Sequence, residues 1–96
     1  MNVTVARAVL ASRGWSRIAI GVGIIDHGCS LILATSPRGV MHTFRACPLS
    51  VCELVFRDDG TIEYRNQVSR HTLDVALDVL LRQAEQADIL ADGRPQ

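Results

Sequence analysis

Apolar runs alternate with turn signals through the middle of the chain. Clusters of glycine, proline, aspartate or serine recur roughly every ten residues, as in strands joined by tight turns. The runs between these clusters are rich in β-branched and aliphatic residues, and they span 17–25, 29–36, 40–47, 51–57 and 61–67. Short turns between consecutive strands favour hairpins, which join antiparallel neighbours. We therefore predict a five-stranded antiparallel meander.

A long helix is predicted at the C-terminal end. Its start lies at Ser69 or Thr72, both of which can cap a helix, and its end lies near Leu90. The apolar positions recur at the spacing of one helix face. They are Leu73, Ala76, Leu77, Leu80, Ala84 and Ala87. We assign 1–90 to one domain and expect 91–96 to be a flexible tail.

A short helix is predicted at the N-terminal end as well. Thr4 can cap it, and Gly14 can end it just after Arg13. The alternation of Val3 and Val5 around Thr4 leaves a leading strand as the alternative. With the short N-terminal helix, the fold class is α+β: a five-stranded antiparallel β-meander packed against a long C-terminal helix.

Alternation within the strands predicts which side chains face the core. In the last two strands, we expect the apolar set on the core face: Leu54, Phe56, Ile62 and Tyr64. We expect the charged set in water on the other face: Glu53, Arg57, Glu63 and Arg65. His42 shares the phase of Val40 and Phe44. We therefore place it toward the core as a hydrogen-bonded structural residue.

The first two predicted strands are apolar on both faces. One helix covers one face of a sheet, so the second face needs another cover. The residues that we place on this second face are Ala19, Gly21, Gly23, Ile25, Ile32 and Ala34. Either the N-terminal helix or another protein chain would cover it.

The net charge of the chain bears on whether the protein binds nucleic acid. Ten basic and ten acidic side chains give a net charge of zero, which argues against a nucleic-acid binder. All the basic residues are arginines, as is typical of the codon usage of GC-rich bacteria and their phages. Five of them lie in the first half of the chain, against one acid: Arg7, Arg13, Arg17, Arg38 and Arg45. A basic face built from these arginines, which could bind nucleic acid, is therefore the alternative to this exclusion.

Hydropathy and cysteine content bear on localisation. No apolar run reaches the about 18 residues of a membrane helix, and Arg7 and Arg13 interrupt the stretch that a signal peptide would need. We therefore expect a cytoplasmic protein without membrane contact. An odd number of cysteines, three, favours free thiols over a disulfide framework. Cys47 and Cys52 flank a turn, so a disulfide between them is the alternative.

Few motifs suggest chemistry. Gly21 and Gly23 resemble the start of a dinucleotide-binding fingerprint, but the third glycine is missing and no helix is predicted to follow. His27 and Cys29 share a turn with Asp26, which suggests a metal site or an activated thiol. We predict no catalytic residue, no bound metal and no cofactor.

These patterns predict a small non-catalytic protein-binding module of the adaptor or inhibitor type. We expect a homodimer through the apolar face of strands 17–25 and 29–36. The side chains predicted to take part in protein binding are Trp15, Ile25, Ile32, Arg45, Arg57 and Arg65. For Trp15, the alternative is that its side chain closes one end of the core. The first alternative is a thiol- or metal-dependent protein that uses His27, Cys29, Cys47 and Cys52. The second is a nucleic-acid binder that uses the arginines of the N-terminal half.

Overall fold

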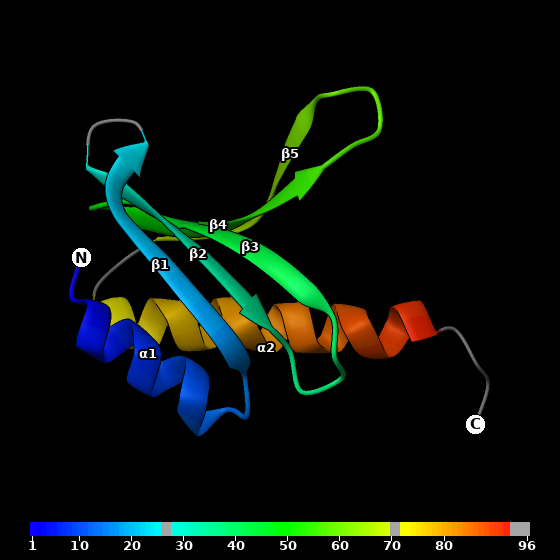
Figure 1. Ribbon diagram of the computed structural model, residues 1–96, viewed down its shortest axis with the longest axis horizontal. Helices are drawn as coiled ribbons and strands as arrows, with labels where there is room; N and C mark the ends of the chain where they lie inside the picture. The colour runs from blue at the N-terminus through cyan, green and yellow to red at the C-terminus, as the bar shows by residue number, and fades with distance from the viewer. Residues whose placement is uncertain (26–27, 70–71, 93–96) are drawn as a thin grey trace.

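The structure is a computed structural model, and it describes residues 1–25, 28–69 and 72–92. The helices are α1 (Val3–Ser12) and α2 (Leu73–Asp92) (Figure 1). The strands are β1 (Ser16–Ile25), β2 (Cys29–Thr35), β3 (Met41–Ala46), β4 (Ser50–Phe56) and β5 (Ile62–Ser69). The predicted α+β class is confirmed, and each strand begins and ends within two residues of its predicted limits.

Tight turns join the strands in sequence order. The sheet order is β1-β2-β3-β4-β5, and every neighbouring pair is antiparallel. Gly39, in the turn between β2 and β3, has a φ of 84°, a left-handed conformation that is strained for residues with a side chain. Its amide donates to the Ser36 carbonyl, and the Ser36 amide donates to the Val40 carbonyl. The meander therefore follows from local turn chemistry.

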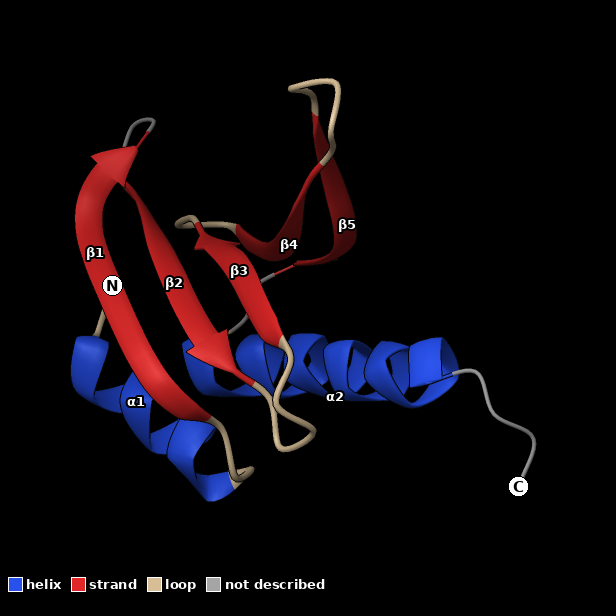
Figure 2. Ribbon diagram, turned by 45° about the vertical axis from the view of Figure 1, so that its right-hand side comes forward, coloured by secondary structure: helices blue, strands red, loops and turns tan. Residues whose placement is uncertain are grey.

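Both helices pack on the same face of the sheet (Figures 1 and 2). α1 is capped by Asn2 rather than by Thr4, and the Asn2 side-chain oxygen accepts a hydrogen bond from the Val5 amide. The fully buried side chains between the helices and the sheet include Ala6, Leu10, Ile32, Phe44, Leu77, Leu80 and Leu81. Because α1 lies beside α2, neither helix covers the second face, which we name the outer face.

The outer face of β2 carries different side chains from those predicted. Ile32 and Ala34, predicted to lie there, are buried under the helices instead. Ile32 pairs with Ile20 of β1, and both side chains contribute to the core. Leu31 and Leu33 take the outer face, where they are half-buried. The strand is apolar at every position from Leu31 to Ala34, so alternation did not distinguish its two faces.

The β4–β5 hairpin also presents the opposite faces from those predicted. β4 pairs with β3 as far as Leu54, which lies opposite Thr43; beyond this pair the hairpin turns away from the helices (Figure 2). The apolar set therefore lies on the outer face: Leu54, Phe56, Ile62 and Tyr64. Glu53, predicted to lie in water, is buried on the helix side. Alternation separates two faces of a strand, but it does not determine which face a helix covers.

A group of charged side chains connects α2 to the end of α1. The Arg13 guanidinium donates to both carboxylate oxygens of Glu85, at 2.9 and 2.7 Å, and to Asp78 at 2.9 Å. The Trp15 indole donates to the Glu85 carboxylate at 2.8 Å. Arg82 pairs with the other oxygen of Asp78 at 3.0 Å. We name these five residues the arginine cluster, which fixes the middle of α2 against α1.

Candidate functional site

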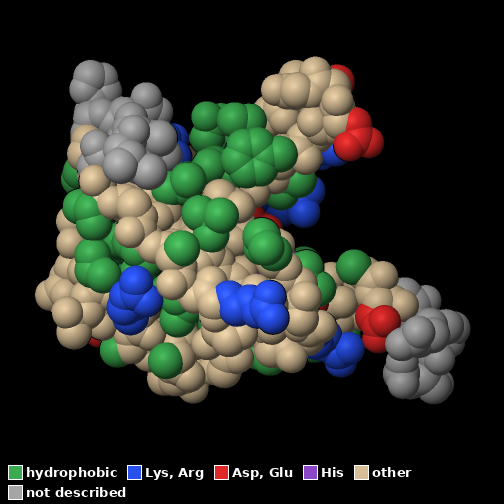
Figure 3. Space-filling view, in the orientation of Figure 1, with side chains coloured by type: hydrophobic (Ala, Val, Ile, Leu, Met, Phe, Trp, Pro, Cys, Tyr) green, Lys and Arg blue, Asp and Glu red, His purple; other side chains and the backbone are tan. Residues whose placement is uncertain are grey.

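The outer face of the sheet carries a group of exposed hydrophobic side chains. The exposed fraction is 69% at Met41, 60% at Phe56, 43% at Ile62 and 56% at Tyr64. We name these four residues the outer patch. Figure 3 shows hydrophobic side chains gathered over the sheet beside the β4–β5 hairpin. Single exposed apolar residues are common on soluble proteins, but a group of them on one face marks a surface that can bind a partner.

Arg45 and Leu54 fix the position of the Tyr64 ring. The guanidinium carbon of Arg45 lies 5.5 Å from the ring centre, within the range of a cation–π interaction. Leu54 pairs with Tyr64 across β4 and β5 and is only 7% exposed, so it lies beneath the outer patch. The Tyr64 ring is therefore supported by neighbours within the same protein.

Opposite charges lie near the two ends of this face. Asp58 and Asp59 occupy the turn between β4 and β5, and Figure 3 shows acidic side chains at this tip. Hydrogen bonds from the hydroxyl and amide of Thr61 lower the pKa of Asp59 below its usual range, so it stays ionised. Arg17 is exposed on β1, where it lines a shallow depression of about 490 Å³ together with Met41.

His42 lies between two carboxylates inside the protein. Its Nδ1 is 2.6 Å from Oε2 of Glu53, and its Nε2 is 2.7 Å from Oδ1 of Asp88. The three side chains come from β3, β4 and α2, and each is at most 8% exposed. We name them the histidine cluster. Trp15 and Phe44 pack against the imidazole, with ring centres 5.3 and 6.0 Å from its own.

The protonated form of His42 satisfies this cluster. Both ring nitrogens face carboxylate oxygens, and the imidazolium has a hydrogen to donate to each. Burial lowers the pKa of His42, but hydrogen bonds and charge attraction from Glu53 and Asp88 outweigh burial and raise the pKa above its ordinary 6.5. With both carboxylates ionised, two negative charges share one positive charge.

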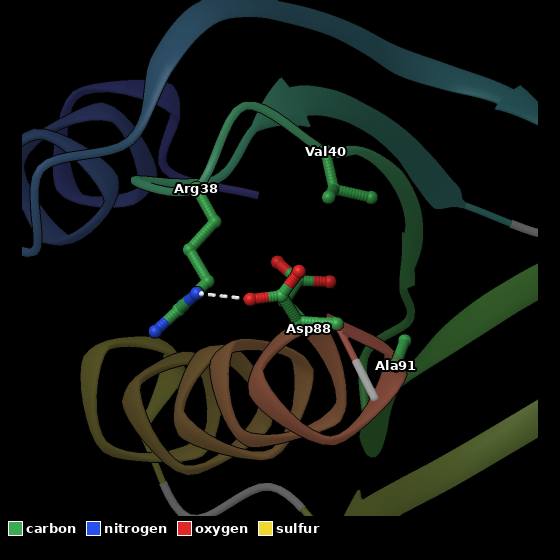
Figure 4. A pocket seen from close by; sticks show the side chains of 5 residues that line it. Arg38, Val40, Asp88 and Ala91 are labelled. Atoms are coloured by element: carbon green, nitrogen blue, oxygen red, sulfur yellow. Dashed lines mark hydrogen bonds and ion pairs between the residues drawn. The ribbon is translucent and has the colours of Figure 1, made fainter. Parts of the chain in front are cut away.

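A pocket of about 250 Å³ lies between the β2–β3 turn and the end of α2 (Figure 4). It is lined by Arg38, Val40, Asp88, Ala91 and Asp92. Arg38 pairs with Asp92 at 3.3 Å. Oδ1 of Asp88 is bonded to His42, whereas Oδ2 is buried and has no hydrogen-bond partner among the described residues. The pocket therefore adjoins the histidine cluster at an unsatisfied acceptor.

Two of the three apolar residues predicted to bind a partner are buried. Trp15 is 3% exposed and closes one end of the core beside His42. Ile32 is fully buried, because β2 turns this side chain toward the helices. The side chain of Ile25 lies outside the part of the chain that the structure describes. The outer patch takes the place of these residues as the apolar surface of the protein.

Of the three arginines predicted to bind a partner, Arg45 lies near the outer patch, whereas Arg65 pairs with Glu53 across β4 and β5 and shares its face of the sheet. Arg45 lies over Tyr64, as described above. Arg57 and Arg65 both form ion pairs with Glu63, at 3.2 Å for Arg65. A role in protein binding remains a prediction for all three, and the position of Arg45 over the exposed Tyr64 ring is compatible with it.

The two acids of the histidine cluster, Glu53 and Asp88, were not predicted from the sequence. His42 is on the core side and hydrogen-bonded, as predicted. Asp88 follows Ala84 by four residues, so it continues the buried stripe of α2, and helical spacing could have identified it. Glu53 shares the phase of Val51, on the strand face that was taken to be in water. An acid within an otherwise apolar stripe is the signal that identifies such a residue.

The cysteines differ from both predicted arrangements. Cys29 and Cys47 form a disulfide across β2 and β3, although 18 positions separate them in the chain. The pairing of Ser30 with Ala46 brings these two cysteines opposite each other at the next position of the ladder. Cys52, the predicted alternative partner of Cys47, is a buried free thiol. The register of β2 against β3 determined which cysteines form the disulfide, and this register could not be predicted from the sequence.

Cysteine chemistry was the basis of the thiol or metal alternative. The disulfide leaves neither Cys29 nor Cys47 with a thiolate to offer in this state. Burial raises the pKa of Cys52, which makes it a weak nucleophile. His27 lies outside the described residues. Within those residues, no group of three or more histidine, cysteine or acidic side chains is placed to hold a metal ion.

The arginines of the N-terminal half lie on several elements. Arg7 and Arg13 are on α1, Arg17 is on β1, Arg38 is in the β2–β3 turn and Arg45 is on β3. Arg13 and Arg38 form ion pairs with carboxylates of α2. The nucleic-acid alternative would therefore need a surface assembled from one helix and its C-cap, a turn and two strands.

Comparison with known proteins gives no match to a family model, to a curated protein or to a solved structure. Of the helices formed by the described residues, neither is long and apolar enough to cross a membrane. The outer patch, the histidine cluster and the pocket beside Asp88 are therefore candidate sites on their geometry alone.

Proposed function

We propose that the protein is a small protein-binding module that acts by docking and forms a homodimer through the outer face of its sheet. The observation that supports this proposal is the outer patch, where large apolar side chains are exposed at Met41, Phe56, Ile62 and Tyr64. Burial of such side chains against a partner is favourable because it removes apolar surface from water. Aromatic residues are also enriched in protein–protein interfaces.

The charges around the outer patch favour a second copy of the chain as the partner. In a two-fold dimer, one surface serves both copies, and opposite ends of that surface meet. The acidic tip of one copy, at Asp58 and Asp59, would then face the exposed Arg17 of the other. Each dimer would contain this contact twice. Complementary charges of this kind set the orientation of the two copies more than they add affinity.

This proposal differs from the sequence-based prediction in the strands that carry the contact. The prediction used the first two strands, whose outer side chains include the half-buried Leu31 and Leu33. The outer patch lies instead on β3, β4 and β5, where Met41, Phe56 and Tyr64 are 69%, 60% and 56% exposed. The proposed interface is therefore centred on the base of the β4–β5 hairpin.

Light scattering during size-exclusion chromatography, over a range of protein concentrations, tests the proposal. We expect the wild type to be a dimer that dissociates on dilution. Phe56→Ser should be a monomer at concentrations where the wild type is dimeric, because it removes the large aromatic side chain of β4 from the outer patch. Val75→Ser is the matched control, since Val75 is 57% exposed on α2, away from the outer face.

Two results would contradict the proposed function. One is a wild type that is monomeric at every concentration. The other is a Phe56→Ser protein that is as dimeric as the Val75→Ser protein.

A further inference from the structure

Asp88 places an unsatisfied acceptor in the wall of a pocket. Its side chain is 5% exposed, its Oδ1 is 2.7 Å from His42 Nε2, and its Oδ2 has no hydrogen-bond partner among the described residues. Figure 4 shows the Asp88 side chain directed into the space between Arg38 and Val40. A buried carboxylate oxygen that has lost water without gaining a donor is unfavourable and uncommon. We therefore expect Oδ2 of Asp88 to accept a hydrogen bond from a group that enters the pocket.

The charges around the pocket favour a donor that is a cation. A second pocket, of about 170 Å³, adjoins the first and shares Arg38 and Asp88 with it. Three acids line the two pockets: Glu85, Asp88 and Asp92. Glu85 is paired with Arg13 and Asp92 with Arg38, so Asp88 is the acid of the pocket walls that no arginine pairs with among the described residues. When protonated, His42 adds one positive charge, but Glu53 shares it with Asp88. The balance at this site remains negative.

The remaining walls of the two pockets are apolar. They come from Val40 and Ala91 in the first pocket, and from Pro37 and Ile89 in the second. Such walls favour a charged group that is carried on a short alkyl chain. Arg38 is half-exposed and has a 3.3 Å ion pair with Asp92, so its side chain can move out of the pocket at small cost.

We infer that this pocket binds a primary alkylammonium ion, with the ammonium group bonded to Oδ2 of Asp88 and the alkyl chain against Val40 and Ala91. A guanidinium ion suits the site less well, because it binds a carboxylate through two parallel hydrogen bonds. His42 already occupies one oxygen of Asp88. Asp92 lies one helical turn beyond Asp88 and lines the same pocket, so it adds a second carboxylate to the site.

An alkylammonium group can come from a lysine side chain of another protein or from a free small amine. This chain contains no lysine, so a second copy of it supplies no such side chain. The ammonium site is therefore independent of the proposed homodimer. Failure of either proposal leaves the other one standing.

An NMR titration of the isotope-labelled protein with n-butylammonium chloride tests the site. We expect saturable shifts of the Val40 and Ala91 amides, and no such shifts with sodium chloride at equal ionic strength. Asp88→Asn should weaken binding by at least about tenfold, because it removes a charge-assisted hydrogen bond. Arg38→Ala should strengthen binding by about two- to fivefold, because it removes a competing cation of surface ion-pair strength.

Two acetylated peptides, identical except for one lysine or one arginine, identify the source of the cation. A lysine peptide that binds more tightly than n-butylammonium supports a protein partner, and one that binds more weakly supports a free amine. An arginine peptide that binds more tightly than the lysine peptide overturns the preference for ammonium.

The site itself is overturned if neither the wild type nor Arg38→Ala gives saturable shifts. It is also overturned if Asp88→Asn binds n-butylammonium as well as the wild type does. Should Asp88→Asn fail to fold, Arg38→Ala still decides the matter, because Arg38 is a half-exposed turn residue.

Discussion

Two ionic clusters connect α2 to the rest of the protein, and they differ in burial and in their cation. The arginine cluster joins α2 to the end of α1, and its Arg13 side chain is 24% exposed. The histidine cluster joins α2 to the sheet, and its His42 side chain is 8% exposed. Arginine keeps its charge throughout the physiological pH range, whereas histidine can lose its charge within that range. Within that range, the cation of the arginine cluster therefore stays charged, whereas the cation of the histidine cluster depends on a bound proton.

The pKa shifts express the same difference. Hydrogen bonding from Arg13 lowers the pKa of Glu85, and the same bond raises the pKa of Arg13, so each partner favours the charged form of the other. For His42, burial is the largest influence on the pKa, and it opposes the two carboxylates. A charged contact in a buried site is strong once formed. The same burial disfavours the charged form of the histidine, because it removes water from the imidazolium.

Replacing His42 with leucine should produce the largest loss of stability. Glu53 and Asp88 would remain buried without the cation that they share. Removal of one partner from a buried ionic contact costs about 3–5 kcal/mol of unfolding free energy. Urea denaturation, followed by circular dichroism, measures this loss.

The matched control for this variant is the triple variant His42→Leu/Glu53→Gln/Asp88→Asn. It removes the two charges that the single variant leaves unpaired, so we expect it to be more stable than His42→Leu alone. Equal stability of the two variants would contradict this explanation. A loss below about 1 kcal/mol for His42→Leu, the range of a surface ion pair, would contradict it as well.

The two clusters should lose their contributions at opposite ends of the pH scale. The folded pKa of His42 lies above its ordinary 6.5, so its contribution is complete below that pH and is lost as the pH rises through the folded pKa. The folded pKa of Glu85 lies below its ordinary 4.5, so its contribution is present above that pH and is lost as the pH falls through the folded pKa. The melting temperature, measured across this range, should therefore fall at both ends.

The triple variant again supplies the control, because it lacks the titrating histidine. We expect its melting temperature to keep the fall on the acid side and to lose most of the fall on the alkaline side. An alkaline fall as steep as that of the wild type would assign the effect to other groups.

The helices and strands were predictable because local signals specify them. Gly39 and Gly60 adopt positive φ in two of the turns, and glycine at these positions is a signal that the sequence displays directly. The buried stripe of α2 follows helical spacing, so its existence and position were also readable. These features depend on residues that are close together in the chain.

The covered faces of the strands were not predictable from alternation. Phe56 and Tyr64 alternate with charged residues, as core side chains would, yet they lie on the outer face because the hairpin turns away from α2. The position of α2 relative to β4 and β5 is a long-range property that a period of two residues does not contain. The outer patch was therefore mistaken for core.

The histidine cluster was predictable only in part, for the same reason. The phase of His42 with Phe44 placed its side chain on the core side. Its partners are distant in the chain: Glu53 is 11 positions away and Asp88 is 46 positions away. Helical spacing could have identified Asp88 as a buried acid, but its pairing with His42 requires the packing of α2 on the sheet.

Glu85→Gln tests the arginine cluster and should cost less than His42→Leu. Glutamine keeps an oxygen for the Trp15 indole but loses the charge that attracts Arg13. Because about a quarter of the Arg13 and Glu85 side chains is in water, solvent replaces part of the lost interaction. We expect a loss of about 1–2 kcal/mol of unfolding free energy at neutral pH, between the values for surface and buried ion pairs.

Arg82→Ala is the control for that measurement, and its expected loss is the smallest, about 0.3–0.5 kcal/mol. Arg82 is an exposed partner of Asp78 one helical turn away, so water compensates for most of the pair. If Glu85→Gln costs as little as Arg82→Ala, the arginine cluster is no stronger than a surface pair. If it costs as much as His42→Leu, burial does not explain the difference between the two clusters, and the number of charged partners becomes the better explanation.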